Sequence, residues 1–214
     1  MKIDEHYTQR EEKANIITHQ VGLVLAIIGT AVLFAKFAQN PSNNSFLSNA
    51  LFCFGLIAVY GTSVLYHQAK KKQDKLTLKL LDHLCIFVLI GGTYMPLMNK
   101  YFEKPFSTIF LSIIWVLILI GVLLKLFLHS RYNKFFSALI YSMIGSMVLL
   151  ILKPVYHNTP HEIFYLIMGG GAFYLIGVLF YIWKRKEFTH AIWHCFVILG
   201  SIMHYLAIYK TLSY

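Results

Sequence analysis

Apolar residues dominate seven long runs of the chain, and short polar segments separate these runs. Most of the runs reach the length of about 20 residues that a helix needs to cross a bilayer, because a helix rises about 1.5 Å per residue. The fifth run is the shortest. We therefore predict seven membrane-spanning segments, at residues 16–38, 46–66, 80–99, 106–128, 135–152, 161–183 and 189–209.

The fold class follows from these runs. In lipid a spanning segment must satisfy its own backbone hydrogen bonds, so spans of this kind are helices. The polar connections are too short to hold a soluble domain. The charged leader before the first run and the length of that run argue against a cleavable signal peptide. We expect an all-α integral membrane protein, a seven-transmembrane helix bundle, with an N-terminal segment (residues 1–15) before a transmembrane domain (residues 16–210).

The composition supports this class of protein. Hydrophobic residues make up 57% of the chain and charged residues 13%, whereas a soluble domain is about half apolar and about a quarter charged. The three cysteines all fall inside apolar runs, so no disulfide framework is predicted. The net charge is +10. No stripe of basic and aromatic residues accompanies this excess, so we predict no nucleic-acid partner.

Basic residues are divided unevenly between the two sides of the predicted bundle. Fourteen of the 19 Lys and Arg residues lie in the N-terminal segment, or in and beside the connections on the same side of the membrane. The cytoplasmic connections of membrane proteins carry such an excess. The N-terminus is therefore predicted in the cytoplasm and, because the number of spans is odd, the C-terminus outside.

The last apolar run contains three histidines, although ionisable residues are costly in a membrane. His190 and His194 are four residues apart, which places both rings on one face of a helix, about 6 Å apart along its axis. This spacing suits two nitrogen ligands of one metal ion. The spacing alone is a weak signal, because His157 and His161 repeat it in a segment that Pro160 marks as a loop.

Further polar residues are predicted at the same membrane level as this pair. His67 closes the second run, with Ser63 one helical turn before it, and Asp82 opens the third run. Three histidines with an open coordination position are typical of catalytic zinc. Asp82 would then hold and deprotonate a water, and Ser63 would donate to a carbonyl or oxyanion. Two simpler roles stay open, in which Asp82 pairs with Lys79 and Ser63 bonds back to a helix carbonyl. His204, about ten residues deeper in the last run, is either a partner of the site or a packing residue.

Four sequence blocks resemble one known family. They read EEKANIITH at 11–19, SVLYH at 63–67, LLDH at 80–83 and HAIWH at 190–194. In this order they resemble the haemolysin III branch of the progestin and adipoQ receptor (PAQR) family, over nearly the whole chain. The compact chain without soluble extensions is similar to the bacterial branch, which implies a multi-pass protein of the bacterial plasma membrane.

The resemblance implies a seven-helix bundle with a cytoplasmic N-terminus and a bound zinc ion. It implies that Asp82 holds the zinc-bound water and that Ser63 fills the serine position of the family. The implied zinc ligands are His67, His190 and His194. The first-helix motif of the family, Glu-x-x-Asn-x-x-x-His, matches Glu12, Asn15 and His19.

Several functions stay open at this point. The first is a zinc-dependent intramembrane hydrolase with a membrane lipid amide or ester as substrate, since the family's site resembles that of alkaline ceramidases. The second is a zinc-stabilised sensor or regulator of membrane state, which a closed site would favour. The third is a haemolysin-type cytolysin, although we find neither a cleavable signal nor amphipathic spans. A transporter or proton channel would need ionisable groups at several depths, whereas most of these residues share one level.

Overall fold

The chain forms a helical bundle in a computed structural model that describes residues 7–39, 46–127, 134–183 and 186–214. All regular secondary structure in these ranges is helical, and seven helical segments are long and apolar enough to span a membrane. This confirms the predicted all-α membrane protein with seven spans. The elements are α1 (Gln9–Gln39), α2 (Phe46–Gln68), α3 (Lys72–Tyr101), α4 (Phe106–Phe127), α5 (Lys134–Gly145), the 3₁₀ helix η1 (Ser146–Ile151), α6 (Leu152–Asn158), α7 (His161–Ile182) and α8 (Thr189–Thr211).

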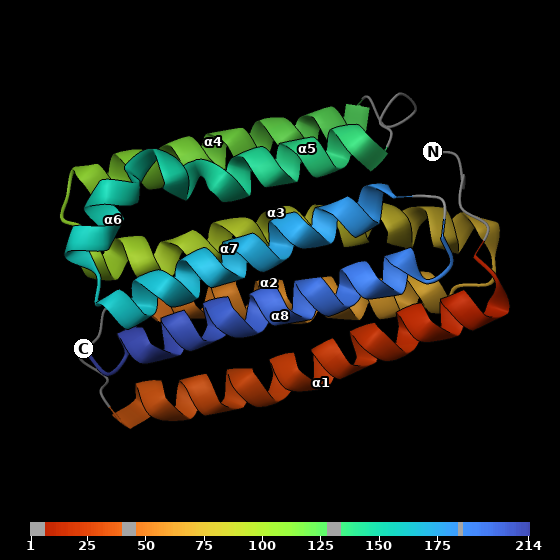
Figure 1. The fold of residues 1–214 in the computed structure, drawn as a ribbon, viewed down its shortest axis with the longest axis horizontal. Helices are drawn as coiled ribbons and strands as arrows, with labels where there is room; N and C mark the ends of the chain where they lie inside the picture. The colour runs from red at the N-terminus through yellow and green to blue at the C-terminus, as the bar shows by residue number, and fades with distance from the viewer. Residues whose placement is uncertain (1–6, 40–45, 128–133, 184–185) are drawn as a thin grey trace.

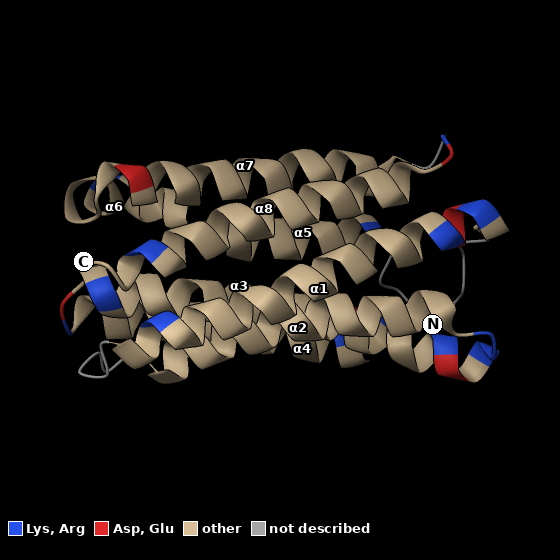
Figure 2. Ribbon diagram, turned by 90° about the horizontal axis from the view of Figure 1, so that it is seen from below, with Lys and Arg blue, Asp and Glu red and all other residues tan. Residues whose placement is uncertain are grey.

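The helices run side by side along the long axis of the bundle (Figure 1). α2 packs most extensively on α3, and α7 on α8, while α1 contacts both α2 and α8. α4 and α5 lie on the side away from α1 (Figure 1). Figure 2 shows that Lys, Arg, Asp and Glu gather toward the two ends of the bundle. The apolar middle of the bundle therefore matches the hydrocarbon layer of a membrane.

The first helix begins before the apolar run that predicts it. At its start, the Thr8 hydroxyl accepts a hydrogen bond from the Glu11 amide (3.2 Å), and the Glu11 carboxylate accepts one from the Thr8 amide (2.9 Å). Such a capping box satisfies amides that have no partner inside the helix. α1 consequently starts at Gln9 and includes Glu12 in its first turns, whereas the expected segment boundary lies at residue 15.

The fifth span is a broken helix. α5 ends at Gly145, η1 follows, and α6 completes the span to Asn158. The Tyr94 hydroxyl of α3 donates to the Gly145 carbonyl (2.7 Å) and accepts from the Val148 amide (3.1 Å). It therefore replaces backbone partners at the break, as a membrane interior requires. The span is longer than the apolar run that predicts it, and His157, expected in a loop, lies in α6.

α2 and α3 approach each other closely because glycines face the neighbouring backbone. A Cβ atom on Gly55 would lie 2.8 Å from the Leu89 Cα atom, and a Cβ atom on Gly92 would lie 3.0 Å from the Phe52 Cα atom. Small residues at such points allow membrane helices to pack tightly. This pairing holds the end of α2 beside the start of α3, where the polar residues of the expected site lie.

Candidate metal centre

Three histidines from two helices meet at one end of the bundle. His67 lies in the last turn of α2, and His190 and His194 lie in the first turns of α8. One ring nitrogen from each histidine lies within 4.8 Å of the other two. All three side chains are largely buried, and His194 is fully enclosed. The three residues predicted as metal ligands are therefore close enough to bind one ion.

Each of these histidines has a buried ring nitrogen without a partner. His67 Nε2, His190 Nδ1 and His194 Nε2 form no hydrogen bond to any of the described residues. Buried polar atoms are normally hydrogen-bonded, so three unpaired nitrogens in one place require an explanation. Imidazole nitrogens are common ligands of Zn²⁺, and three histidines with an open position are typical of catalytic zinc. The donor set therefore fits the expected ion.

Two side chains of α1 determine which nitrogens of the centre carry hydrogen. Glu12 Oε2 lies 2.6 Å from His67 Nδ1, and a carboxylate only accepts, so His67 Nδ1–H is the donor. Thr18 Oγ1 lies 3.0 Å from His194 Nδ1 and itself donates to carbonyl oxygens of the preceding turn. His194 Nδ1–H therefore donates to Thr18. Both Nε2 atoms keep their lone pairs, as metal ligands require.

The centre is covered at the end of the bundle by Tyr7, which precedes α1. The Tyr7 ring stacks on the His190 ring, with 5.1 Å between the ring centroids and an interplanar angle of 27°. Lys134 of α5 donates a 3.4 Å hydrogen bond to the Tyr7 hydroxyl. Burial raises the pKa of that hydroxyl well above its ordinary value, so it stays neutral at physiological pH. Tyr7 thus shields one side of the centre from water.

Asp82 and Ser63 lie next to each other but outside the group of three clustered histidine nitrogens. Ser63 is a hydrogen-bonding neighbour of the Asp82 carboxylate, and Lys79 and Lys125 supply nearby positive charge. Asp82 and Ser63 are both buried. Lys79 is therefore one of several neighbours of the Asp82 carboxylate. Ser63 is hydrogen-bonded to this carboxylate, and Lys125 is a second positive charge close to it.

The remaining residues of the first-helix motif also lie at the centre. The His19 ring centroid is 3.7 Å from that of His194. Both ring nitrogens of His19 and the side-chain amide of Asn15 are buried and lack partners among the described residues. Glu12 contacts His67 directly and also forms an ion pair with Lys75. α1 therefore supplies the polar surroundings of the three histidines.

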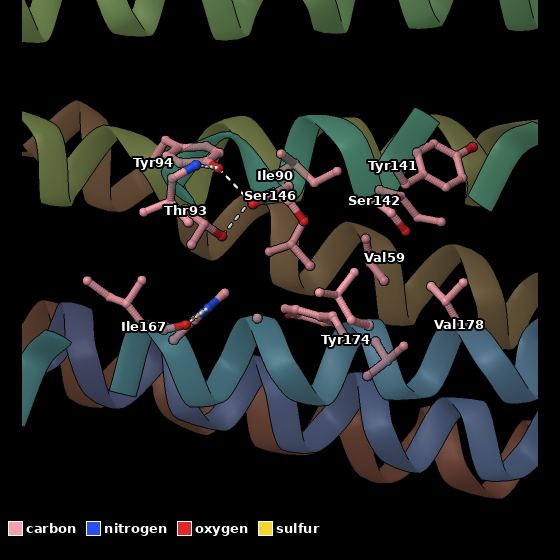
Figure 3. Close-up of a pocket in the computed structure, with 18 of the residues that line it drawn as sticks. Val59, Ile90, Thr93, Tyr94, Tyr141, Ser142, Ser146, Ile167, Tyr174 and Val178 are labelled. Carbon is pink, nitrogen blue, oxygen red and sulfur yellow. Dashed lines mark hydrogen bonds between the residues drawn. The ribbon is translucent and has the colours of Figure 1, made fainter. Parts of the chain in front are cut away.

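A cavity runs along the inside of the bundle from this region. It measures about 180 Å³, roughly twelve times the ~15 Å³ that suffices for one water. Asp82 and His19 line it at the end near the histidines, and Met98 and Phe102 line it at the far end of α3. Figure 3 shows side chains of α7, such as Tyr174, facing those of α3 and α5 across this space. The walls are mostly apolar, as is usual for ligand-binding cavities.

Sequence reasoning missed two residues of the centre and the cavity. Tyr7 and Thr18 contact His190 and His194, yet Tyr7 precedes the first quoted block and Thr18 fills an unspecified position of the first-helix motif. Glu12 is an acidic residue close to the start of a span, and such a residue indicates that a polar partner lies nearby. That this partner is His67 becomes visible only in the fold. The cavity depends on side chains from many helices, so no single run predicts it.

The fold and the centre together define a multi-pass membrane protein with a buried cluster of three histidines. The model of the family described as "Haemolysin-III related" matches residues 7–205. The chain is 32% identical over 199 residues to "Hemolysin-3" of Bacillus cereus, covering 93% of this chain and 90% of that protein. It is 35% identical over 195 residues to "Hemolysin-3 homolog" of Bacillus subtilis (strain 168), covering 91% of each.

A human relative is similar over a comparable share of this chain, at lower sequence identity. "Monocyte to macrophage differentiation factor" of Homo sapiens is 28% identical over 212 residues, covering 94% of this chain and 84% of that protein. The chain belongs to the haemolysin III family, which is a branch of the PAQR family. It is a multi-pass bacterial membrane protein.

Proposed function

We propose that this protein is a zinc-dependent intramembrane hydrolase that acts on a lipid amide or ester from the cytoplasmic level of the membrane. The observation that carries the proposal is the convergence of three unpaired histidine nitrogens beside a long apolar cavity. A lipid chain fits the cavity walls, and its carbonyl would lie at the end lined by Asp82 and His19. The cytoplasmic level follows from the distribution of basic residues.

The chemistry divides between the ion and the side chains. His67, His190 and His194 would hold a zinc ion, which would supply a Lewis acid that polarises a carbonyl and favours deprotonation of water. The Asp82 carboxylate accepts a proton from the attacking water and passes it to the leaving amine or alcohol. The Ser63 hydroxyl orients that carboxylate or donates to the developing oxyanion. The apolar cavity excludes bulk water from the reacting carbonyl.

Metal analysis of the detergent-purified protein tests the first part of the proposal. We expect about one zinc per chain in the wild type and its loss in His194→Ala, because one of three ligands is removed. His161→Ala is a matched control, since His161 begins α7 outside the group of three ligands. A wild-type protein without metal, purified in the absence of chelator, would contradict the zinc site and the hydrolase mechanism with it.

Hydrolysis of lipid amides and esters tests the second part. Asp82→Asn keeps the size of the side chain and removes its ability to accept a proton. We expect a decrease in the rate of release of fatty acid of about 10² to 10⁴-fold, with unchanged zinc content. Zinc-loaded wild-type protein that releases no fatty acid from ceramides, other lipid amides or lipid esters would argue against catalysis.

One observation favours the second candidate, a zinc-stabilised sensor of membrane state. Among the described residues, the cavity walls include Asp82 and His19 but none of the three histidines. A metal separated from the cavity would be structural. The same measurements distinguish the candidates. A sensor loses thermal stability when zinc is removed and shows no hydrolysis, whereas the hydrolase loses activity in Asp82→Asn while its stability is retained.

A further inference from the structure

His204 is a polar residue in the middle of the last span, away from the metal centre. It lies ten residues after His194 on the same helix, about 15 Å further along the axis. Its Nε2 atom is 3.0 Å from the Ile167 carbonyl oxygen of α7. A carbonyl only accepts, so Nε2 carries the hydrogen and Nδ1 is an acceptor. None of the described residues donates to Nδ1.

The packing of α7 against α8 is adapted to this ring. A Cβ atom on Gly170 would lie 2.2 Å from the His204 Cδ2 atom, so a larger residue would displace the histidine. His204 lines the cavity and is only partly buried. Part of its surface therefore faces the internal space, at a depth where an unpaired polar atom is costly.

Three polar side chains around this part of the cavity, those of Tyr174, Ser201 and Thr93, already have hydrogen-bond partners. The Tyr174 ring lies beside His204, with 5.4 Å between the centroids, and its hydroxyl is hydrogen-bonded to Ser201 (2.8 Å). Ser201 also accepts from Tyr60 (2.8 Å). Across the cavity, the Thr93 hydroxyl donates to a carbonyl of its own helix (2.7 Å) (Figure 3). These groups have partners, whereas His204 Nδ1 still requires a donor.

We propose that His204 forms a second polar subsite in the cavity, which accepts a hydrogen bond from a hydroxyl group in the middle of a lipid acyl chain. The inference rests on the proposed function, because it takes the chain to be anchored by its carbonyl near Asp82 and His19, and the His19 ring lies at the level of His194. The two levels are ~15 Å apart by the helix rise, and an extended acyl chain, which advances about 1.25 Å per carbon, covers that distance with about twelve carbons. The preferred ligand is therefore an acyl chain hydroxylated near carbon 12, rather than an unsubstituted chain.

Binding of three fatty acids to the full-length detergent-purified protein tests this subsite. The probes are stearate, 12-hydroxystearate and 2-hydroxystearate, measured by displacement of a fluorescent fatty acid. In the wild type we expect 12-hydroxystearate to bind about fivefold more tightly than stearate, as one added hydrogen bond allows. 2-Hydroxystearate should show no such gain, because its hydroxyl lies at the wrong depth. Equal affinities for stearate and 12-hydroxystearate would overturn the inference.

Two variants test whether the His204 side chain itself is responsible for the preference for 12-hydroxystearate. His204→Leu removes the acceptor and should bind stearate and 12-hydroxystearate with equal affinity. Tyr205→Phe is the matched control, because Tyr205 donates to the Gly29 carbonyl of α1 and does not line this cavity. It should keep the fivefold preference. A preference that survives in His204→Leu overturns the subsite.

The comparison of the three fatty acids in the wild type needs no variant. The inference can therefore still be tested if His204→Leu folds poorly. If the wild type binds none of the three fatty acids, the proposed lipid site fails and the subsite fails with it. If stearate and 12-hydroxystearate bind equally well, only the subsite fails. Zinc content, measured on the same samples, shows separately whether the metal centre is intact.

Discussion

Glu12 and His67 belong to different helices, yet Glu12 Oε2 lies 2.6 Å from His67 Nδ1. This contact does more than connect α1 to α2. A carboxylate that accepts from one ring nitrogen fixes the tautomer of the histidine and increases the basicity of the other nitrogen. The second nitrogen, His67 Nε2, is one of the three unpaired atoms of the centre. Glu12 therefore leaves the lone pair of His67 Nε2 available, as a metal ligand at this position would require.

Glu12→Gln should weaken metal binding because a neutral amide no longer stabilises the ligand. Loss of such a partner typically lowers metal affinity about 10- to 100-fold. Competition with a zinc chelator of known affinity measures the change. Glu162→Gln is the matched control, because Glu162 pairs with Lys210 in the partly exposed start of α7. An unchanged zinc affinity in Glu12→Gln would contradict this role.

Thr18→Val should have a smaller effect on the same measurement. Valine keeps the shape of threonine but cannot accept from His194 Nδ1, so the imidazole loses one hydrogen bond. A bond of this kind corresponds to a decrease in zinc affinity of between about twofold and tenfold. Thr18→Ser retains the hydroxyl and should restore the wild-type value. If the serine variant is as weak as the valine variant, packing rather than the hydrogen bond is responsible.

Tyr7→Ala should accelerate the exchange of zinc with chelator in solution. The Tyr7 ring covers His190, and its removal opens a path for water to the ligand nitrogens. We expect faster zinc release with little change in total metal content. Tyr7→Phe keeps the stacked ring and should release zinc at the wild-type rate. A slow release in Tyr7→Ala would show that access to the centre is controlled elsewhere.

The spans could be predicted from the sequence because the lipid phase imposes one requirement on all of them. A run of apolar residues near 20 in length has no stable alternative to a helix in lipid. The break in the fifth span could not be predicted in this way. It depends on Tyr94, a residue of another helix, which supplies hydrogen bonds to Gly145 and Val148. Tertiary partners of this kind leave no periodic pattern in the broken segment itself.

The three histidines could be predicted as a group because their spacing and predicted depth coincide. His190 and His194 share a helix face, and His67 ends a span that leads to the same side of the membrane. The supporting residues are different. Thr18 is an ordinary residue of an apolar helix, and Tyr7 lies before any regular structure. Their roles arise only when the packing of α1 brings them to α8.

The orientation of the bundle is a prediction from the distribution of charge, and reporter fusions can test it. The connection between α2 and α3, together with the start of α3, carries five lysines, so we expect it in the cytoplasm. Alkaline phosphatase needs an oxidising compartment to form its disulfides. Fused after Tyr214 it should be active, and fused within residues 69–71 it should be inactive. The reverse pattern would move the metal centre to the outer side and contradict the cytoplasmic level in the proposed function.

Gly171→Leu should block the cavity without disturbing the centre. A Cβ atom at Gly171 meets nothing within 4 Å, although its neighbour Gly170 is closely packed against His204. Gly171 lines the cavity, so the added side chain fills space that a lipid chain would occupy. We expect fatty-acid affinity to fall at least about tenfold, since the leucine and a lipid chain cannot occupy the same space without overpacking.

Gly171→Leu should weaken lipid binding without lowering the stability of the protein. The same leucine adds apolar contacts in an otherwise open space, so the melting temperature in detergent should stay level or rise. Zinc content should be unchanged, because Gly171 lies on α7, away from the three ligand histidines. Gly171→Ala, with a smaller side chain, should give an intermediate affinity. Full fatty-acid binding by a stable Gly171→Leu protein would mean that the lipid chain lies elsewhere, and the cavity would then serve the packing of the bundle rather than its function.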